Sequence, residues 1–279
     1  MLIKNFWRSK NNIPRRGFWF IIRKLIGWMR AFEVSIFEQE KNYKIVGLNR
    51  KDGLKKLDSV LQELFGKKYD ERNGMFSEHL ILLASFSVSN ISINKILEIG
   101  TYDGRTALIL SKLFPKSSIL TIDLPASKYE FESTYNRDKT ANAFVMNRNK
   151  RIHDAFNADF KEMNSLGLCN FEDSFDLIWI DGAHGYPVVA MDIINSFRLA
   201  SDGGHVLIDD IWKSVPISDK MYKSISGFES LQSLVDAQLI SSFSLFPKRL
   251  LGEFNYPGKR NLSGYLLRRF KSNRLVNER

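Results

Sequence analysis

The chain has 279 residues, 44% of them hydrophobic, which allows one large domain with extensions and an ample core. Its single cysteine, Cys169, excludes an internal disulfide and a cysteine-based metal cluster, so a reducing, cytoplasmic setting is the default. The net charge of +10 lies at the two ends: residues 1–30 hold eight Lys/Arg and no acid, residues 248–279 carry a net +7, and the middle is therefore −5. An acidic middle argues against a nucleic-acid groove, and the basic ends suit contact with anionic lipid or another acidic surface.

Residues 1–35 are basic and aromatic, and their apolar side chains recur at helical spacing. Arg23 and Lys24 interrupt the apolar run, which excludes a transmembrane helix, and no small-residue cleavage site follows, which argues against a secretory signal peptide. Two interpretations stay open: a helix lying on a membrane surface, or a helix packed on the core or across a dimer. Residues 36–50 read as an irregular connector with a strand at 43–46.

The rest of the chain alternates helical and strand patterns, as an α/β domain does. Helices are predicted over 52–66, ended by Gly66, and over 77–88, with Ser77 as the N-cap. The elements predicted after them are a strand at 96–99, a helix at 107–113, a strand at 118–123, a helix at 138–146, a strand within 151–162, a strand at 175–180, a helix at 188–199, a turn at 201–204, a strand at 205–208, a helix at 221–235 and strands at 243–246 and 250–254. The last two strands would complete a seven-stranded sheet with a reversed edge strand.

A glycine-bearing turn joins the first predicted strand to its helix, with the pattern Glu98-x-Gly100-x-x-x-Gly104-x-Thr106. The glycines let a ligand approach the backbone, and the helix start offers free N–H groups. The G-x-G-x-x-G of a dinucleotide site is absent. The pattern resembles motif I of class I S-adenosylmethionine-dependent methyltransferases; the alternative is an ordinary turn in another α/β protein. The resemblance implies a Rossmann-like seven-stranded sheet with helices on both faces, and S-adenosylmethionine as the cofactor.

The same resemblance implies the residues that hold the cofactor. In that family the glycine turn lies under the methionine part, and the acidic residue at the Glu98 position helps to place the turn and the cofactor's amino end. Asp123 ends the second strand, where a carboxylate can accept both ribose hydroxyl protons. Asp159 is the nearest match to the aspartate that accepts from the adenine amino group, although a turn or a helix cap explains it as well. The turn at 73–75 could contact the cofactor or simply join two helices. The predicted cofactor-binding residues are Glu98, Gly100, Thr101, Gly104, Thr106, Asp123, Asp159 and Asp181.

Three carboxylates follow two consecutive strands: Asp181 ends one, and Asp209 and Asp210 end the next. If the strands are neighbours, the carboxylates converge at one edge, and hard oxygen ligands in such a cluster suit Mg²⁺. The arrangement resembles the metal-dependent O-methyltransferases of the catechol type, and more closely the branch that modifies sugar hydroxyls of macrolides. His184 stands three residues after the first aspartate, as in the sugar branch, and resemblance gives it the role of general base. The alternatives are aspartates that cap helices or face solvent, and a structural His184.

The sequence therefore predicts an O-methyltransferase that acts on a hydroxyl of a small molecule or glycan, with Mg²⁺ held by the three aspartates. Its segments are a basic N-terminal extension (1–50), the methyltransferase domain (51–256) and a basic C-terminal tail (257–279). The rival hypotheses are a nucleic-acid methyltransferase that uses the basic ends, and a non-catalytic membrane-associated module with the same fold. We expect a cytoplasmic protein that touches an anionic membrane through 1–35 and 257–279, with homo-oligomerisation left open.

Overall fold

The structure is a computed structural model that describes residues 36–70, 78–125, 141–213, 224–247, 262–263 and 267–268. The predictions for residues 1–35, for the turn at 73–75, for the Ser77 cap and for the strand at 250–254 lie outside these ranges. Within them, no helix has the length and hydropathy needed to cross a bilayer.

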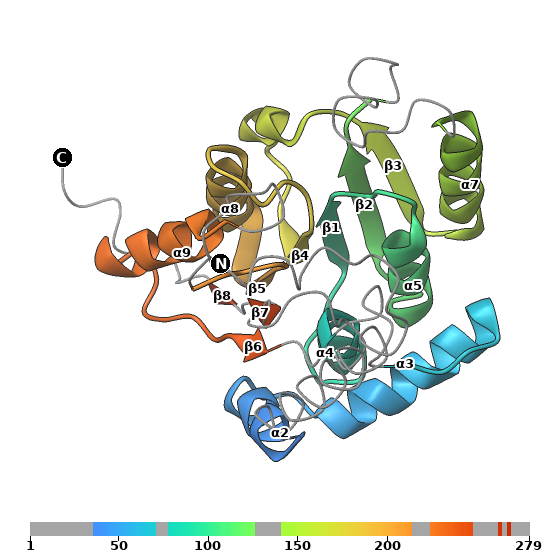
Figure 1. Cartoon of the computed structure of the whole chain (residues 1–279), viewed down its shortest axis with the longest axis horizontal. Helices are drawn as coiled ribbons and strands as arrows, with labels where there is room; N and C mark the ends of the chain where they lie inside the picture. Colours follow the sequence, from blue (N-terminus) through green and yellow to red (C-terminus); the bar gives the residue numbers. More distant parts are fainter. Residues whose placement is uncertain are drawn as a thin grey trace, which may run out of the picture.

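A six-stranded sheet in the order β3-β2-β1-β4-β5-β8 forms the centre of the molecule (Figure 1). Its first five strands run parallel to their neighbours, and β8 pairs antiparallel with β5. The strand order reverses between β1 and β4, so a crevice for a ligand is expected at the carboxyl ends of these two strands. The strands are β1 (Lys95–Ile99), β2 (Ser118–Asp123), β3 (Ala158–Glu162), β4 (Phe175–Ile180), β5 (Ala200–Ile208) and β8 (Leu267–Arg268).

The predicted α/β Rossmann-like fold is confirmed, but the predicted count of seven strands is not supported. The strand expected at 243–246 is reduced to β6 (Phe246–Pro247), which pairs with β7 (Leu262–Ser263) in a separate two-stranded sheet. The reversed edge strand is β8, which comes from the segment predicted to be a basic tail. A strand of two residues carries no periodicity, so the sequence could not indicate β7 or β8.

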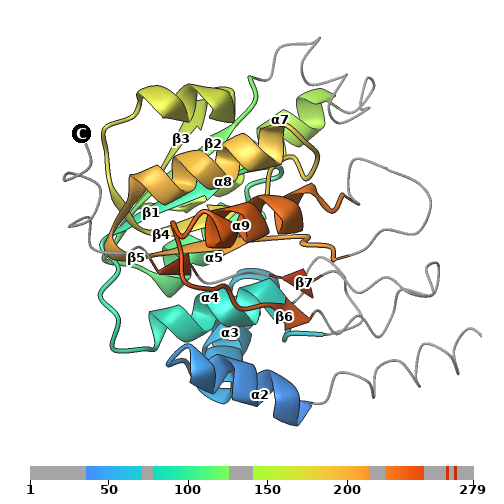
Figure 2. The same ribbon diagram turned by 90° about the vertical axis from the view of Figure 1, so that its left-hand side faces the viewer.

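Helices cover both faces of the sheet (Figure 2). One face packs against α3 (Arg50–Phe65), α4 (Glu78–Ser87) and α5 (Arg105–Leu113), and α7 (Ala141–Asp154) lies beside α5 and β3. The other face packs against the short helix η2 (Ser165–Asn170), α8 (Val188–Leu199) and α9 (Ser226–Asp236). We call these the α4 face and the α8 face.

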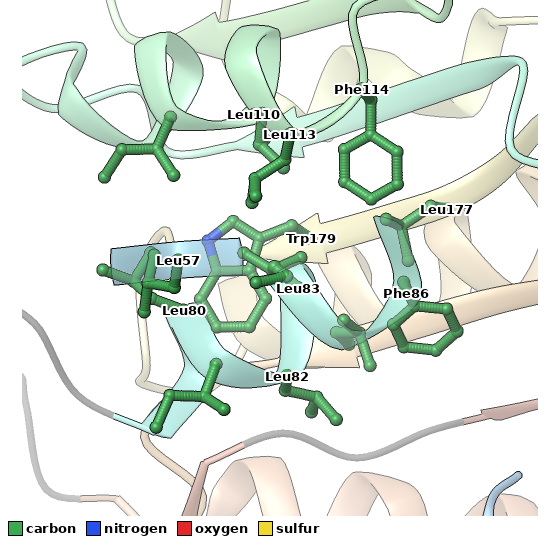
Figure 3. Packing of buried hydrophobic residues seen from close by; sticks show 14 of the residues in the cluster. Leu57, Leu80, Leu82, Leu83, Phe86, Leu110, Leu113, Phe114, Leu177 and Trp179 are labelled. Carbon is green, nitrogen blue, oxygen red and sulfur yellow. The ribbon is translucent and has the colours of Figure 1, made fainter. Parts of the chain in front are cut away.

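Over most of their length the side chains of the central strands alternate between the two faces, and Phe175, at the irregular start of β4, is an exception. On β4, Leu177 and Trp179 belong to the core under the α4 face, whereas Ile178 and Ile180 belong to the core under the α8 face. Figure 3 shows the Trp179 ring among leucines of α3, α4 and α5. Because β-strand side chains alternate with a period of two, this parity decides the face toward which each strand-end residue points.

The prediction of an irregular connector with a strand at 43–46 is wrong, because Ile36–Ile45 form the helix α2. The apolar residues Phe37 and Ile45 are exposed, so the apolar pattern of this stretch has no helical periodicity to read. The helix is held instead by Tyr43, which is fully buried and donates its hydroxyl proton to Glu78 Oε1 at 2.9 Å.

The other helices and strands largely follow the prediction. Helix α3 begins after an Asn49 cap and ends at Gly66, whose φ of 63° is left-handed. Helix α7 continues to Asp154, so the strand predicted within 151–162 takes up only the later part of that range, as β3 from Ala158. Strand β5 starts at Ala200, so it includes residues 201–204, which were predicted to form a turn. At this point the pairing of β5 with β4 is irregular.

Candidate active site

The glycine turn after β1 lies against the chain that leaves β4. Gly100 has a φ of 101°, and a Cβ built on it would lie 2.3 Å from the backbone oxygen of Asp181. The amides of Gly100 and Thr101 both donate to the Ile122 carbonyl, at 2.9 and 3.2 Å. Only glycine allows this approach, because any side chain would collide with backbone atoms. The turn is therefore fixed between the ends of β2 and β4.

The second glycine of the motif starts α5. Gly104 has a φ of 77°, and a Cβ on it would lie 3.1 Å from the Arg148 carbonyl oxygen on α7. Its amide donates to Thr101 at 2.9 Å, which closes the turn. Thr106 follows in the first turn of α5, so Thr101, Gly104 and Thr106 all lie just after the carboxyl end of β1, and their binding of the cofactor stays a prediction.

Glu98 lies beneath this turn and is fully buried on the α4 face of β1. Its carboxyl group accepts a hydrogen bond from the Thr121 hydroxyl, which in turn lies 2.6 Å from the Thr101 hydroxyl. Burial, reinforced by the nearby carboxylates of Asp123 and Asp103, raises the pKa of Glu98 to about 8 despite the bond from Thr121. Glu98 therefore supports the turn from below as a carboxyl group that is largely protonated at neutral pH.

Asp123 ends β2 and orders the same turn. One carboxylate oxygen accepts from the Tyr102 amide at 2.6 Å, and the other accepts from the Leu124 amide at 2.8 Å. These bonds hold Tyr102 at a φ of 48°, which is uncommon for a residue other than glycine. The predicted ribose-binding aspartate thus lies beside the glycine turn.

Asp159 does not reach this edge. It is the second residue of β3, it is exposed, and it pairs with Leu120, three residues before Asp123. The sequence placed the third strand only within 151–162 and matched Asp159 to the adenine-binding aspartate by resemblance, but the first part of that range is still helix α7. The carboxyl end of β3 is Glu162, so the structure separates Asp159 from the other predicted cofactor-binding residues.

His184 lies between two of the predicted carboxylates. Its Nε2 is 3.9 Å from Asp181 Oδ1 and 3.9 Å from Asp210 Oδ2. The imidazole is buried, whereas the Asp181 side chain keeps 32% of its surface exposed. The imidazole Nε2 therefore faces two carboxylates at the carboxyl edge of the sheet, one of them partly exposed.

Asp209 points away from this group. Its Oδ2 lies 3.9 Å from Nδ1 of His79 on α4, and the His79 ring stacks on Trp179 with centroids 5.0 Å apart. Asp210 has a φ of 51°, so the chain turns sharply between the two aspartates. The sequence singled out Asp209 and Asp210 as one ligand pair, but each has a different histidine neighbour.

The predicted magnesium site is not supported by this geometry. Among the residues that the structure describes, no group of three His, Cys, Asp or Glu side chains is arranged to hold a metal ion. Asp181 and Asp210 share His184 as a neighbour, but Asp209 lies with His79. The side chains as placed therefore do not fit a three-carboxylate Mg²⁺ site.

Sequence reasoning also missed Asp192, a buried carboxylate on α8. Burial raises its pKa to about 6, against a hydrogen bond from Ser165 that lowers it. Its Oδ2 would lie 3.5 Å from a Cβ on Gly182, in the loop after β4. Asp192 therefore lies buried beside the loop that follows β4. Asp192 lies three residues after Val189 and one before Ile193, which puts it on the buried side of the predicted helix. This spacing could have identified it from the sequence as a buried acid.

Comparison with known proteins gives one family match, and residues 97–211 match the model of a methyltransferase domain. This range contains every predicted site residue from Glu98 to Asp210. The prediction that the chain is a methyltransferase is thereby confirmed for this domain. A comparison with curated proteins gives no match.

Several solved structures resemble the chain at low identity. Cofactor-bound Rv0187 from MTB is 15% identical, with a TM-score of 0.47, and the match covers 67% of this chain and 76% of that one. The O-methyltransferase TomG from Streptomyces achromogenes, in complex with SAM, is 14% identical, with a TM-score of 0.47 and coverage of 82% and 93%. The SAH-bound methyltransferase PaMTH1 from Podospora anserina is 15% identical, with a TM-score of 0.46 and coverage of 84% and 93%. Likenesses of this size carry no inference about the acceptor or the mechanism of this chain.

Proposed function

Because residues 97–211 are a methyltransferase domain, we propose that the protein is an S-adenosylmethionine-dependent O-methyltransferase whose general base is His184. The observation that carries this proposal is the position of His184 between Asp181 and Asp210, at the edge where the glycine turn after β1 also lies. The acceptor is a hydroxyl compound, either a small molecule or a glycan.

The cofactor would lie across the carboxyl ends of β1, β2 and β4. Gly100 and Gly104 keep the turn under its methionine part tight, because each packs against the backbone of a neighbouring segment, and the backbone that Asp123 orders would lie beside the ribose. A carboxylate can accept about four hydrogen bonds, so Asp123 would accept ribose hydroxyl protons in addition to the backbone amides of Tyr102 and Leu124.

The methyl transfer needs one proton to leave the acceptor. His184 Nε2 takes the hydroxyl proton, the oxygen forms a bond to the methyl carbon of S-adenosylmethionine, and the sulfur–carbon bond breaks to give S-adenosylhomocysteine. Asp181 and Asp210 stabilise the imidazolium that forms, because both carboxylates lie 3.9 Å from the same nitrogen. Orientation of the two reactants would supply most of the remaining rate acceleration.

The direct test is turnover of methyl-labelled S-adenosylmethionine on a panel of hydroxyl compounds. We expect His184→Asn to lower kcat by roughly 10²- to 10⁴-fold while the affinity for S-adenosylhomocysteine stays the same. His153→Asn is the matched control, because the His153 side chain is 91% exposed on α7, away from the edge. Equal turnover in wild type and His184→Asn would refute the base role, and absent binding of S-adenosylhomocysteine by the wild type would refute the cofactor.

Magnesium assistance stays a prediction, and the same assay decides it. If Mg²⁺ takes part, excess chelator abolishes turnover and added Mg²⁺ restores it; full activity in chelator removes the metal from the mechanism. A panel with no active hydroxyl compound but an active RNA would favour the nucleic-acid hypothesis. Binding of S-adenosylhomocysteine without turnover on any acceptor would favour the non-catalytic module.

A further inference from the structure

The loop that carries His184 is bonded to the sheet at its start. The Asp181 amide donates to the Ile99 carbonyl at 2.8 Å, which continues the pairing of β4 with β1. The next two amides, those of Gly182 and Ala183, donate to no other protein atom in the part of the chain that the structure describes. The stretch of backbone that leads directly to the proposed base therefore carries two unpaired donors.

Asp192 lies on the α8 side of this stretch. Its side chain is fully buried, and its Oδ2 is 3.5 Å from the position that a Cβ on Gly182 would take. The same position lies 3.5 Å from Cγ2 of Ile99, the last residue of β1. Gly182 is therefore enclosed between the end of β1 and the Asp192 carboxyl group.

The Asp192 carboxyl group lacks the strong partners that a buried acid needs. Neither oxygen has a partner at ordinary hydrogen-bond length and angle among the described residues, so the bond from Ser165 is a weak one. A buried polar group without a good partner costs free energy, and an apolar side chain of similar volume is often more stable at such a position. A residue that breaks a rule of stability in this way is expected where function requires it.

The two sets of unpaired groups complement each other. The oxygens of Asp192 are acceptors, and the amides of Gly182 and Ala183 beside them are donors. One ordered water can join a donor to an acceptor when the gap is too long for a direct bond, and a buried water of this kind is costly to remove. The carboxyl group can therefore hold the loop without touching the reactants.

We propose that Asp192 is a positioning residue: its carboxyl group accepts hydrogen bonds from the amides of Gly182 and Ala183, directly or through one water, and so holds His184 in place. The consequence for catalysis rests on the proposed function, whereas the contact between Asp192 and the loop does not. Glu98 supports the glycine turn from the α4 face, and Asp192 would support the base from the α8 face.

The kinetic test compares Asp192→Leu with Asp192→Asn in the full-length protein, with methyl-labelled S-adenosylmethionine and a hydroxyl compound that the wild type methylates. Leucine has a similar volume and accepts no hydrogen bond, so we expect kcat to fall by roughly 10²-fold, as a misplacement of about 1 Å can cause. Asparagine keeps one acceptor oxygen, so its kcat should stay within about tenfold of the wild type. The KM for the acceptor should change less than kcat, because the base acts mainly in the transition state.

Ser196→Ala is the matched control. Ser196 is also fully buried on α8 with an unpaired Oγ, but it lies one helical turn further from the loop, so its loss should leave kcat unchanged. Denaturant midpoints at pH 8 separate positioning from structural support. Asp192→Leu should unfold at no lower denaturant concentration than the wild type, because it removes a poorly paired buried acid, and should still be slower. A residue that only supported the fold would show the reverse.

Amide hydrogen exchange tests the contact itself, without any ligand. Exchange at residues 182–184, followed by mass spectrometry, should be about tenfold faster in Asp192→Leu than in the wild type. It should be close to the wild type in Asp192→Asn and in Ser196→Ala. Exchange along α8 should be the same in all four proteins, which shows that the helix itself is undisturbed.

Equal exchange at residues 182–184 in the wild type and Asp192→Leu overturns the proposal, whether or not the protein methylates any compound. Equal kcat in an active wild type and Asp192→Leu also overturns it, as does Asp192→Asn as slow as Asp192→Leu, or the same loss of kcat in Ser196→Ala. A wild type that methylates nothing refutes the proposed function instead, and the exchange measurement then decides alone for Asp192.

Discussion

The buried Glu98 makes the stability of this domain depend on pH in an unusual direction. The pKa of its carboxyl group is 4.5 in the unfolded chain and about 8 in the folded protein, mainly because burial disfavours the charged form. Below pH 4.5 both states hold the proton. As the pH rises toward 8, the unfolded chain releases the proton and the folded protein keeps it, so the free energy of the unfolded state falls relative to that of the folded state and the protein becomes less stable.

The magnitude follows from the interval between the two values. At about 1.4 kcal/mol per pH unit, the interval from 4.5 to about 8 corresponds to a loss of roughly 5 kcal/mol of unfolding free energy across that range. At pH 7 roughly 3 kcal/mol of this loss has already occurred. Glu98→Gln removes the titration and keeps an oxygen that can accept from Thr121, but its amide buries donors at a cost of about 1–3 kcal/mol. The plots of unfolding free energy against pH for the wild type and for Glu98→Gln should therefore cross between acid and neutral pH.

Denaturant unfolding from pH 5 to pH 8 is the assay. The free energy of unfolding of Glu98→Gln should fall less steeply with pH than that of the wild type, and the variant should be at least as stable near pH 8. Asp173→Asn is the control, because the side chain of Asp173 is 59% exposed and its loss should leave the slope unchanged. Parallel curves for wild type and Glu98→Gln would refute the argument that a buried neutral carboxyl group supports the turn.

Further predictions concern the turn, a buried ion pair and a second buried acid. Gly100→Ala should lower the free energy of unfolding by about 3 kcal/mol or more and weaken the binding of S-adenosylhomocysteine, because the new Cβ collides with backbone atoms at a position that is also strained by its positive φ. Gly203→Ala is the comparison: Gly203 has a φ of 77° but open space around it, so this change should cost only about 1 kcal/mol in unfolding experiments. Arg50→Met should destabilise by roughly 3–5 kcal/mol because it leaves Glu78 buried without its 2.7 Å partner, and adding Glu78→Met should recover part of that loss; a double variant worse than the single one would contradict this. Asp192→Asn should be more favourable to stability, relative to the wild type, at pH 8 than at pH 4, because the folded wild-type protein holds the Asp192 proton up to about pH 6. The same difference in unfolding free energy between variant and wild type at both pH values would contradict this.

The sequence predicted the residues at strand ends where the strand is long and buried. Gly100, Asp123 and Asp181 follow runs of five or six residues with clear apolar content, and the structure brings all three to one edge. The sheet order places β1 between β2 and β4, so the two aspartates flank the glycine turn. Correct strand boundaries were sufficient for this part of the site.

The same reasoning failed where the boundary was misplaced or where no apolar pattern exists. Asp159 was matched by resemblance while the third strand was placed only within 151–162; helix α7 continues to Asp154, so Asp159 lies near the start of β3 and not at its carboxyl end. Helix α2 was missed because its exposed apolar residues lie opposite its buried ones, Gln39 and Tyr43. A helix that buries a polar and an aromatic side chain gives no apolar period to detect.

The pairing of Asp209 with Asp210 failed for a reason that also yields a prediction. On β5, Leu207 belongs to the core under the α4 face, and by alternation Asp209 points to the same side, where His79 lies. Asp210 has a left-handed backbone conformation, and its own side chain points toward His184 instead.

A magnesium ion that used both aspartates would have to draw Asp209 away from His79, so the two contacts compete. If the protein binds Mg²⁺ through Asp209, His79→Phe should therefore increase the Mg²⁺ affinity measured by calorimetry, because it keeps an aromatic ring on Trp179 and removes the competing nitrogen. If Asp209 is only a structural partner of His79, the variant should lose stability and gain no affinity for the metal. A lower Mg²⁺ affinity in His79→Phe would show instead that His79 supports the metal site, which this geometry does not predict.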